Sequence, residues 1–93
     1  MAHLTDPERT QALVNRVRRI GGQLQAVERA LEGGADCAVT LQRVAAVRGA
    51  VAGLMDEIML DHLRAHVAAP GLSDAERQRG ADELAAVLSR YAK

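Results

Sequence analysis

Apolar residues in the first third of the chain recur in alternating steps of four and three. The positions are Leu13, Val17, Ile20, Leu24, Val27 and Leu31. This spacing predicts an amphipathic helix with a coiled-coil-like seam that packs along its whole length. Thr5 and Glu8 have the spacing of a capping box around Pro7, so the helix should begin there. Gly33-Gly34 should end it with a left-handed turn.

A second helix is predicted from Asp36, a plausible N-cap, to about Ala68, shortly before Pro70. Its apolar residues spread over a wide arc of the helix surface. They are Leu41, Val44, Val47, Val51, Leu54, Met55 and Ile58. An arc of that width indicates packing on more than one side.

Small residues recur at every fourth position of this second helix, at Ala45, Gly49 and Gly53. A glycine in a helix interior costs about 1 kcal/mol relative to alanine, so these glycines need a packing reason. We expect another helix to approach closely along this line.

A third helix should follow the Pro70-Gly71 turn. Ser73 and Glu76 have capping-box spacing, and the helix should run to about Tyr91, although Gly80 weakens its first half. Leu84, Val87, Leu88 and Tyr91 share one face. Without any strand signal, the chain is predicted to be all-α, a single domain over residues 1–93 with a mobile tail over residues 1–5.

Composition narrows the class of protein. The chain of 93 residues has equal numbers of basic and acidic residues and one cysteine, so an intramolecular disulfide is excluded. We find no signal peptide and no apolar run long enough to cross a bilayer, so a cytoplasmic protein without membrane contact is expected. A chain this short buries a limited core by itself, which favours a homo-oligomer.

Cys37, His62 and His66 carry the clearest chemistry. The two histidines are four residues apart and project from one helix face. Cys37 lies 25 residues before His62, which is about 37 Å along a helix, so one subunit cannot bring them to one metal. Two antiparallel copies of the helix would bring Cys37 of one subunit near both histidines of the other. The structural alternative is two solvated histidines near a helix end.

Basic residues flank the seam of the first helix. Arg9, Arg16 and Arg19 fall on one strip, whereas Arg18 points elsewhere. Such charges are often only a solvated face, but arginine also binds phosphate, and two strips joined by symmetry would follow a DNA backbone. Enzyme signatures such as a Gly-rich phosphate loop, G-x-S-x-G or H-E-x-x-H are absent, so we expect no catalytic activity.

Several segments together resemble one family. They are residues 16–23 (RVRRIGGQ), 41–50 (LQRVAAVRGA), 53–55 (GLM) and 62–66 (HLRAH), together with Cys37. The chain resembles the CsoR/RcnR/FrmR repressors over nearly its whole length. The resemblance implies an antiparallel dimer, a disc-shaped tetramer of two dimers, and a repressor that leaves operator DNA when an effector binds.

The resemblance also implies roles for individual residues. DNA-contacting positions carry over to Arg16, Arg19 and Arg48, with Arg18 a weaker candidate. Effector positions carry over to His3, Cys37, His62 and His66. This set resembles the His-Cys-His-His pattern of the nickel- and cobalt-sensing branch. Leu63 stands where the copper-sensing branch has its second cysteine, which disfavours copper(I).

Two alternatives stay open. Zinc could use the same donors. A formaldehyde-responsive repressor could use the Cys37 thiolate and the Ala2 amine, which is freed by the removal of Met1 that we expect before a small residue, with one carbon as the bridge. Ala2 and His66 depart from the formaldehyde-sensing pattern, which has proline at position 2 and lacks the last histidine. A metal-buffering helical oligomer with no DNA role is a further alternative, although it would not need the arginine strip.

Overall fold

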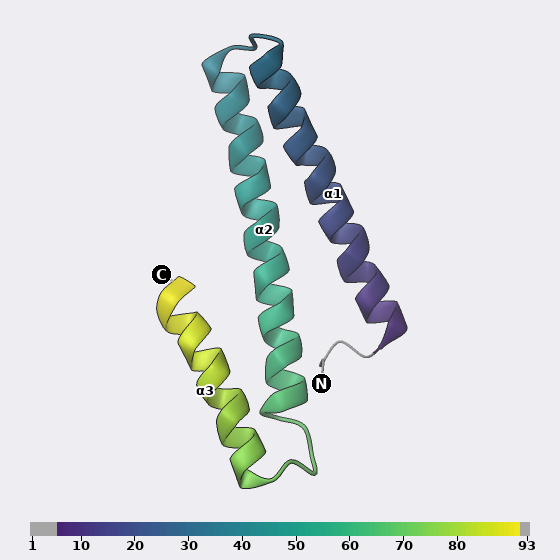
Figure 1. Cartoon of the computed structure of the whole chain (residues 1–93), viewed down its shortest axis with the longest axis vertical. Coiled ribbons are helices and arrows are strands. Elements are labelled where there is room, and N and C mark those ends of the chain that lie inside the picture. The colour runs from purple at the N-terminus through teal and green to yellow at the C-terminus, as the bar shows by residue number, and fades with distance from the viewer. Residues whose placement is uncertain (1–5, 92–93) are drawn as a thin grey trace. The chain divides into compact units, whose positions relative to one another are not determined.

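The described part of the chain is built from three α-helices. A computed structural model describes residues 6–91 and contains α1 (Pro7–Glu32), α2 (Cys37–His66) and α3 (Asp74–Tyr91), with no strand in that range (Figure 1). The predicted all-α class is therefore confirmed. The expected tail over residues 1–5 lies outside the described residues.

Local chemistry fixes both ends of α1. The side chain of Asp6 accepts a hydrogen bond of 3.0 Å from the backbone N–H of Glu8, so Asp6 is the N-cap. The prediction had given this role to Thr5, which lies outside the described residues. At the other end Gly34 has a φ of 69°, the left-handed turn that the sequence predicted.

The second helix starts directly after Asp36, whose carbonyl oxygen accepts a bond of 3.1 Å from the backbone N–H of Thr40. This agrees with the predicted start. The helix ends at His66, two residues earlier than Ala68, where we expected it to end.

The loop before α3 is held by two sets of hydrogen bonds. The guanidinium of Arg77 donates to the carbonyl oxygens of Val67 and Ala69, which follow the last turn of α2. The predicted capping box is confirmed in both directions. The Ser73 backbone N–H donates to Glu76 Oε1 at 3.0 Å, and the Glu76 N–H donates to Ser73 Oγ at 3.1 Å.

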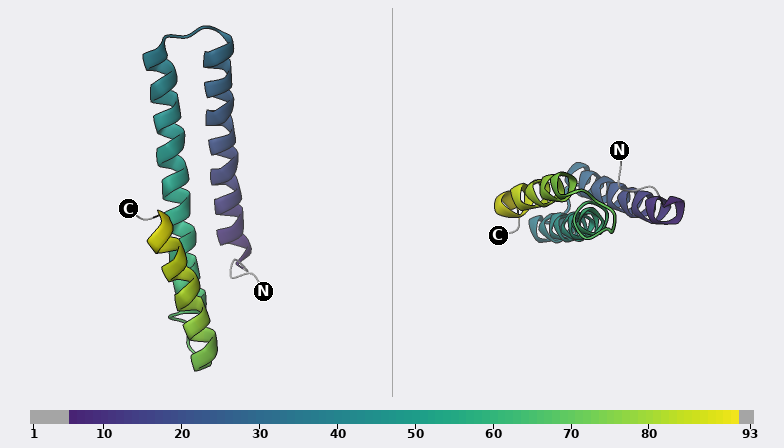
Figure 2. Two further views of the ribbon diagram at one scale, coloured as in Figure 1. Left: turned by 60° about the vertical axis from the view of Figure 1, so that its left-hand side comes forward. Right: turned by 90° about the horizontal axis from the view of Figure 1, so that it is seen from below.

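The described chain divides into two compact units, residues 6–55 and residues 56–91. In the first unit, α1 lies antiparallel to the first part of α2 (Figures 1 and 2). Its buried apolar residues are Leu13, Ile20 and Ala30. In the second unit, α3 folds back beside the last part of α2.

The seam of α1 is only half covered within one chain. Leu13 and Ile20 are buried at 5% and 7% exposure, whereas Val17, Leu24 and Leu31 are 51%, 53% and 67% exposed. The prediction of packing along the whole seam is therefore wrong for the single chain. One neighbouring helix covers one row of the seam, and the other row faces outward.

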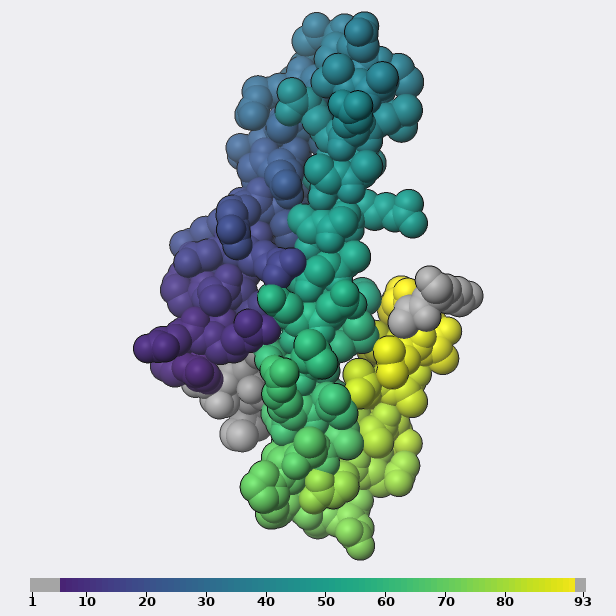
Figure 3. Space-filling model, turned by 180° about the vertical axis from the view of Figure 1, so that it is seen from behind, coloured from purple at the N-terminus to yellow at the C-terminus, as the bar shows by residue number. Residues whose placement is uncertain are grey.

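The apolar surface of α2 is also largely uncovered. No residue of this helix is buried. In the space-filling view, atoms of α2 are visible at the surface along the length of the helix (Figure 3). Its exposed large apolar residues are Val39, Leu41, Val44, Val51, Leu60 and Leu63. By length and composition α2 is apolar enough to span a membrane, contrary to our sequence prediction, but a single such helix is weak evidence for a membrane.

Candidate functional site

Two imidazole rings meet on one face of α2. The ring centroids of His62 and His66 are 4.9 Å apart, as their spacing predicted. The Nε2 atom of His62 lies 3.0 Å from the carbonyl oxygen of Gly80 on α3. Because a carbonyl oxygen only accepts, Nε2 carries the hydrogen in this contact. Glu83 places Oε1 3.7 Å from the same nitrogen, so protonated His62 has a carboxylate beside it.

Gly80 allows α3 to pack directly on the last turn of α2. The residue is buried, and a Cβ atom there would overlap the His66 carbonyl oxygen and lie 2.7 Å from its carbon. Any larger residue would therefore push the two helices apart. From the sequence we expected Gly80 only to weaken the helix, although a mid-helix glycine is itself a signal of close packing.

Cys37 lies at the other end of α2. It is the first residue of the helix and its thiol is exposed. Twenty-five residues of continuous helix, a rise of about 37 Å, separate it from His62. Across residues 6–91 of the single chain, no three histidine, cysteine or acidic side chains gather as a metal site. The predicted donors His3 and Ala2 lie outside the described residues.

The predicted DNA-contacting arginines all belong to the unit formed by residues 6–55. Arg18, Arg19 and Arg48 are exposed, whereas Arg16 is half-buried. The guanidinium of Arg16 reaches across to α2 and lies against Gly53. The sequence placed these residues on helices correctly but gave no sign of this contact.

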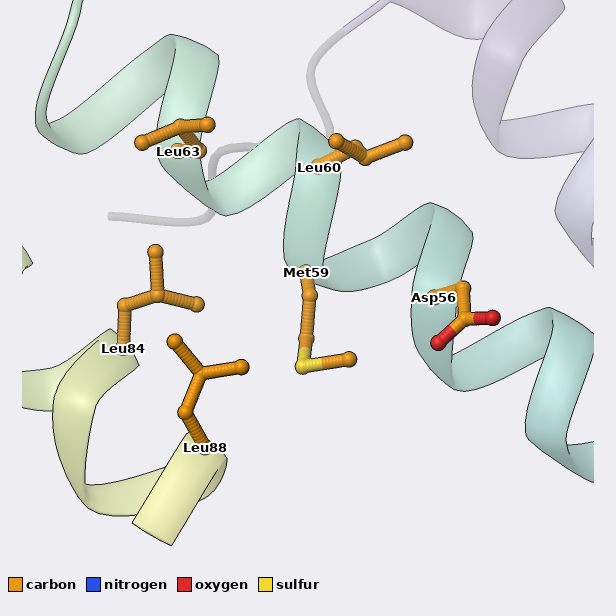
Figure 4. Close-up of a pocket in the computed structure, with 6 residues that line it drawn as sticks. All are labelled: Asp56, Met59, Leu60, Leu63, Leu84 and Leu88. Atoms are coloured by element: carbon orange, nitrogen blue, oxygen red, sulfur yellow. The ribbon is translucent and has the colours of Figure 1, made fainter. Parts of the chain in front are cut away.

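A shallow apolar groove runs between α2 and α3 within residues 56–91, and it was not predicted. It has a volume of about 440 Å³. Figure 4 shows its lining of Asp56, Met59, Leu60, Leu63, Leu84 and Leu88. A single carboxylate among aliphatic side chains offers no acid–base pair or nucleophile, so this groove has the character of a packing surface.

Comparison with known proteins identifies the family. The family described as metal-sensitive transcriptional repressor matches residues 9–90. The chain belongs to this family. It is 40% identical over 83 residues to the transcriptional repressor RcnR of Salmonella arizonae, covering 89% of this chain and 91% of RcnR. It is 48% identical over 81 residues to a Serratia marcescens protein described as uncharacterized in the bioA 5′ region, covering 87% and 89%.

A solved structure of the repressor family also matches closely. It is a variant of the formaldehyde-responsive regulator FrmR from Salmonella enterica serovar Typhimurium, with a TM-score of 0.87 and 41% identity. The match covers 94% of this chain and 98% of that one. The resemblance to the CsoR/RcnR/FrmR family and the three-helix fold are thereby confirmed.

Family membership also settles the broad class of activity. Metal-sensitive transcriptional repressors bind operator DNA, form oligomers and are not enzymes. The metal-buffering alternative is correspondingly disfavoured, because it gives DNA no role.

Proposed function

We propose that this repressor leaves its operator when nickel or cobalt binds a site shared between subunits. Cys37 of one subunit and His62 and His66 of another would be the ligands, with His3 as a further donor. The observation that carries the proposal is the arrangement along α2, with an exposed thiol at one end and two adjoining imidazoles at the other. An antiparallel pair of such helices completes two equivalent sites.

The donor set decides which metal fits. One thiolate with several imidazole nitrogens suits nickel, cobalt or zinc, whereas copper(I) prefers more than one sulfur ligand. Leu63 offers none beside His62. The hydrogen bond from His62 Nε2 to Gly80 supports binding through Nδ1, because the lone pair then lies on that nitrogen.

The DNA surface in this proposal is formed by Arg16, Arg19 and Arg48, with Arg18 contributing less. Arginine side chains bind phosphate through charge-assisted, bidentate hydrogen bonds. Assembly into a dimer of dimers would place several such arginine sets along one duplex. Metal binding would then release DNA by changing the geometry of the subunits, in the cytoplasm where both ligands are met.

The deciding experiment measures release of DNA from the protein's own promoter region by fluorescence anisotropy. Nickel or cobalt should lower DNA affinity, and cobalt should give a sulfur-to-metal charge-transfer absorption that Cys37→Ser abolishes. His66→Ala should weaken cobalt binding more than it changes any response of the protein to an aldehyde. A protein that binds this DNA but ignores nickel, cobalt and zinc would refute the metal proposal.

Formaldehyde sensing is the second candidate, supported by the close match to the formaldehyde-responsive regulator FrmR. Here the amine of Ala2 and the exposed thiol of Cys37 would be joined by the aldehyde carbon, with loss of water. Release of DNA by formaldehyde but not by metals, lost in Cys37→Ser and retained in His66→Ala, would favour this candidate.

A further inference from the structure

We propose that Gly53 is a positioning residue for Arg16. Because Gly53 has no side chain, the Arg16 guanidinium packs directly against it, and this contact orients the guanidinium for DNA. The inference rests on the proposed function, in which Arg16 contacts phosphate. It adds a residue of α2 that touches no DNA yet sets operator affinity.

The contact between the two residues lies within the unit of residues 6–55. An ideal Cβ at Gly53 would overlap Nη2 of Arg16 and lie 3.4 Å from its Cζ. The guanidinium therefore occupies the space that a side chain at position 53 would fill. Arg16 is accordingly half-buried, whereas its neighbours Arg18 and Arg19 are exposed.

Gly49 provides the contrast on the same helix. It lies one turn earlier than Gly53, and a Cβ there would meet no atom of residues 6–91 within 4 Å. Both glycines were predicted to permit close approach of another helix. Of these two glycines, only Gly53 has a close neighbour within residues 6–91, and that neighbour is the end of an arginine side chain.

A guanidinium that is already held in place binds phosphate at a lower entropic cost than one that rotates freely. Arginine carries large rotamer freedom, and its planar fork must be aligned for bidentate bonding. Packing against Gly53 restricts that freedom before DNA arrives, so less is lost on binding. An alanine at position 53 would displace only the flexible end of Arg16, which leaves the α1–α2 packing intact.

Gly53→Ala should therefore weaken DNA binding without unfolding the protein. We expect affinity for the promoter fragment to fall by about three- to tenfold, the cost of ordering one long side chain. Gly49→Ala is the matched control, and Gly22→Ala is a second one on α1, because neither Cβ would meet an atom of the described residues within 4 Å. In all three variants the circular dichroism spectrum and the metal affinity should be unchanged. The thermal unfolding midpoint should be unchanged or higher, because alanine favours the helix more than glycine does.

A double-mutant cycle shows whether Gly53 acts through Arg16. In an Arg16→Ala background, Gly53→Ala should have no further effect on DNA affinity. If Arg16→Ala weakens binding but Gly53→Ala does not, or if their effects add fully, the positioning role is wrong while the DNA surface stands. If Arg16→Ala leaves DNA affinity unchanged, both the inference and this part of the proposed function are overturned.

Discussion

The Nε2 atom of His62 and the carbonyl oxygen of Gly80 lie 3.0 Å apart, which joins a candidate metal ligand on α2 directly to α3. Gly80 also packs against the backbone of His66. We therefore expect a movement of α3 to displace both histidines, and a change at either histidine to act on α3.

Replacing Gly80 with alanine should disturb effector binding. The new Cβ would overlap the His66 carbonyl, a backbone atom that cannot swing aside, so α3 must shift. Overpacking of this kind costs about 1–3 kcal/mol of stability, and loss of the contact to His62 should lower metal affinity about tenfold or more. Metal titration and urea unfolding measure both effects.

A neighbouring substitution controls for helix propensity. Ala81→Gly weakens α3 intrinsically without adding an atom near His66, so it should lower stability while leaving metal affinity nearly unchanged. Equal loss of metal affinity in Ala81→Gly and Gly80→Ala would mean that the contact with the histidines is unimportant.

Mixed oligomers test whether the metal site spans two subunits. Cys37→Ala and His62→Ala should each remove strong metal binding. In an oligomer made of one variant alone, every shared site lacks either the thiol or the first imidazole. A mixed dimer of the two variants should recover one intact site and one doubly damaged site, seen as half the metal stoichiometry. Strong binding by either homogeneous variant would contradict a shared site.

Arg48→Ala and Arg19→Ala should weaken DNA binding through lost phosphate contacts. Each contact releases counterions, so the slope of log affinity against log salt should shrink by about one per contact removed in each DNA-bound subunit. Arg90→Ala, an exposed arginine in the last turn of α3, is the control and should leave the slope unchanged. A slope indifferent to Arg48 and Arg19 would exclude them from the DNA surface.

The capping box of α3 should make stability depend on pH in the acid range. The Ser73 backbone N–H, the Ser73 hydroxyl and the charge of Arg79 hold the pKa of Glu76 below its ordinary value of 4.5. A depressed folded-state pKa stabilises the fold above the unfolded-state pKa, and this contribution disappears as pH falls through the folded-state pKa.

Glu76→Gln should therefore unfold more easily than the wild type near neutral pH, with the difference shrinking in acid. Urea unfolding at several pH values measures this trend. Ser73→Ala removes the Ser73 hydroxyl but keeps the backbone N–H that donates to Glu76 Oε1, so it should reduce the pH dependence only in part. A constant difference between wild type and Glu76→Gln at all pH values would contradict the linkage.

Sequence patterns predicted features that depend on neighbouring residues in the chain. The Ser73–Glu76 box, the left-handed turn at Gly34 and the adjoining rings of His62 and His66 all follow from local spacing. The N-cap of α1 was misplaced by one residue because Thr5 and Asp6 are both good caps.

Features that depend on residues far apart in the chain were harder to predict from the sequence. Periodicity identified the seam of α1 but could not show that Leu13 would be covered and Leu24 left outward. Glycines at positions 53 and 80 were visible as anomalies, but the atoms that fill their space come from another helix. The roles of the arginines, Cys37 and the histidines stay predictions.

The half-covered seam of α1 predicts that the stability of this repressor depends on contacts between several chains. Over the described range the buried apolar residues are Leu13, Ile20 and Ala30. We therefore expect a protomer to gain much of its stability when a partner subunit covers the outward row. By mass action the unfolding midpoint should then rise with protein concentration. At a low cellular concentration of the protein, folded subunits would be lost together with the assemblies that they form. The concentration of the protein would then help to determine how strongly the promoter is repressed.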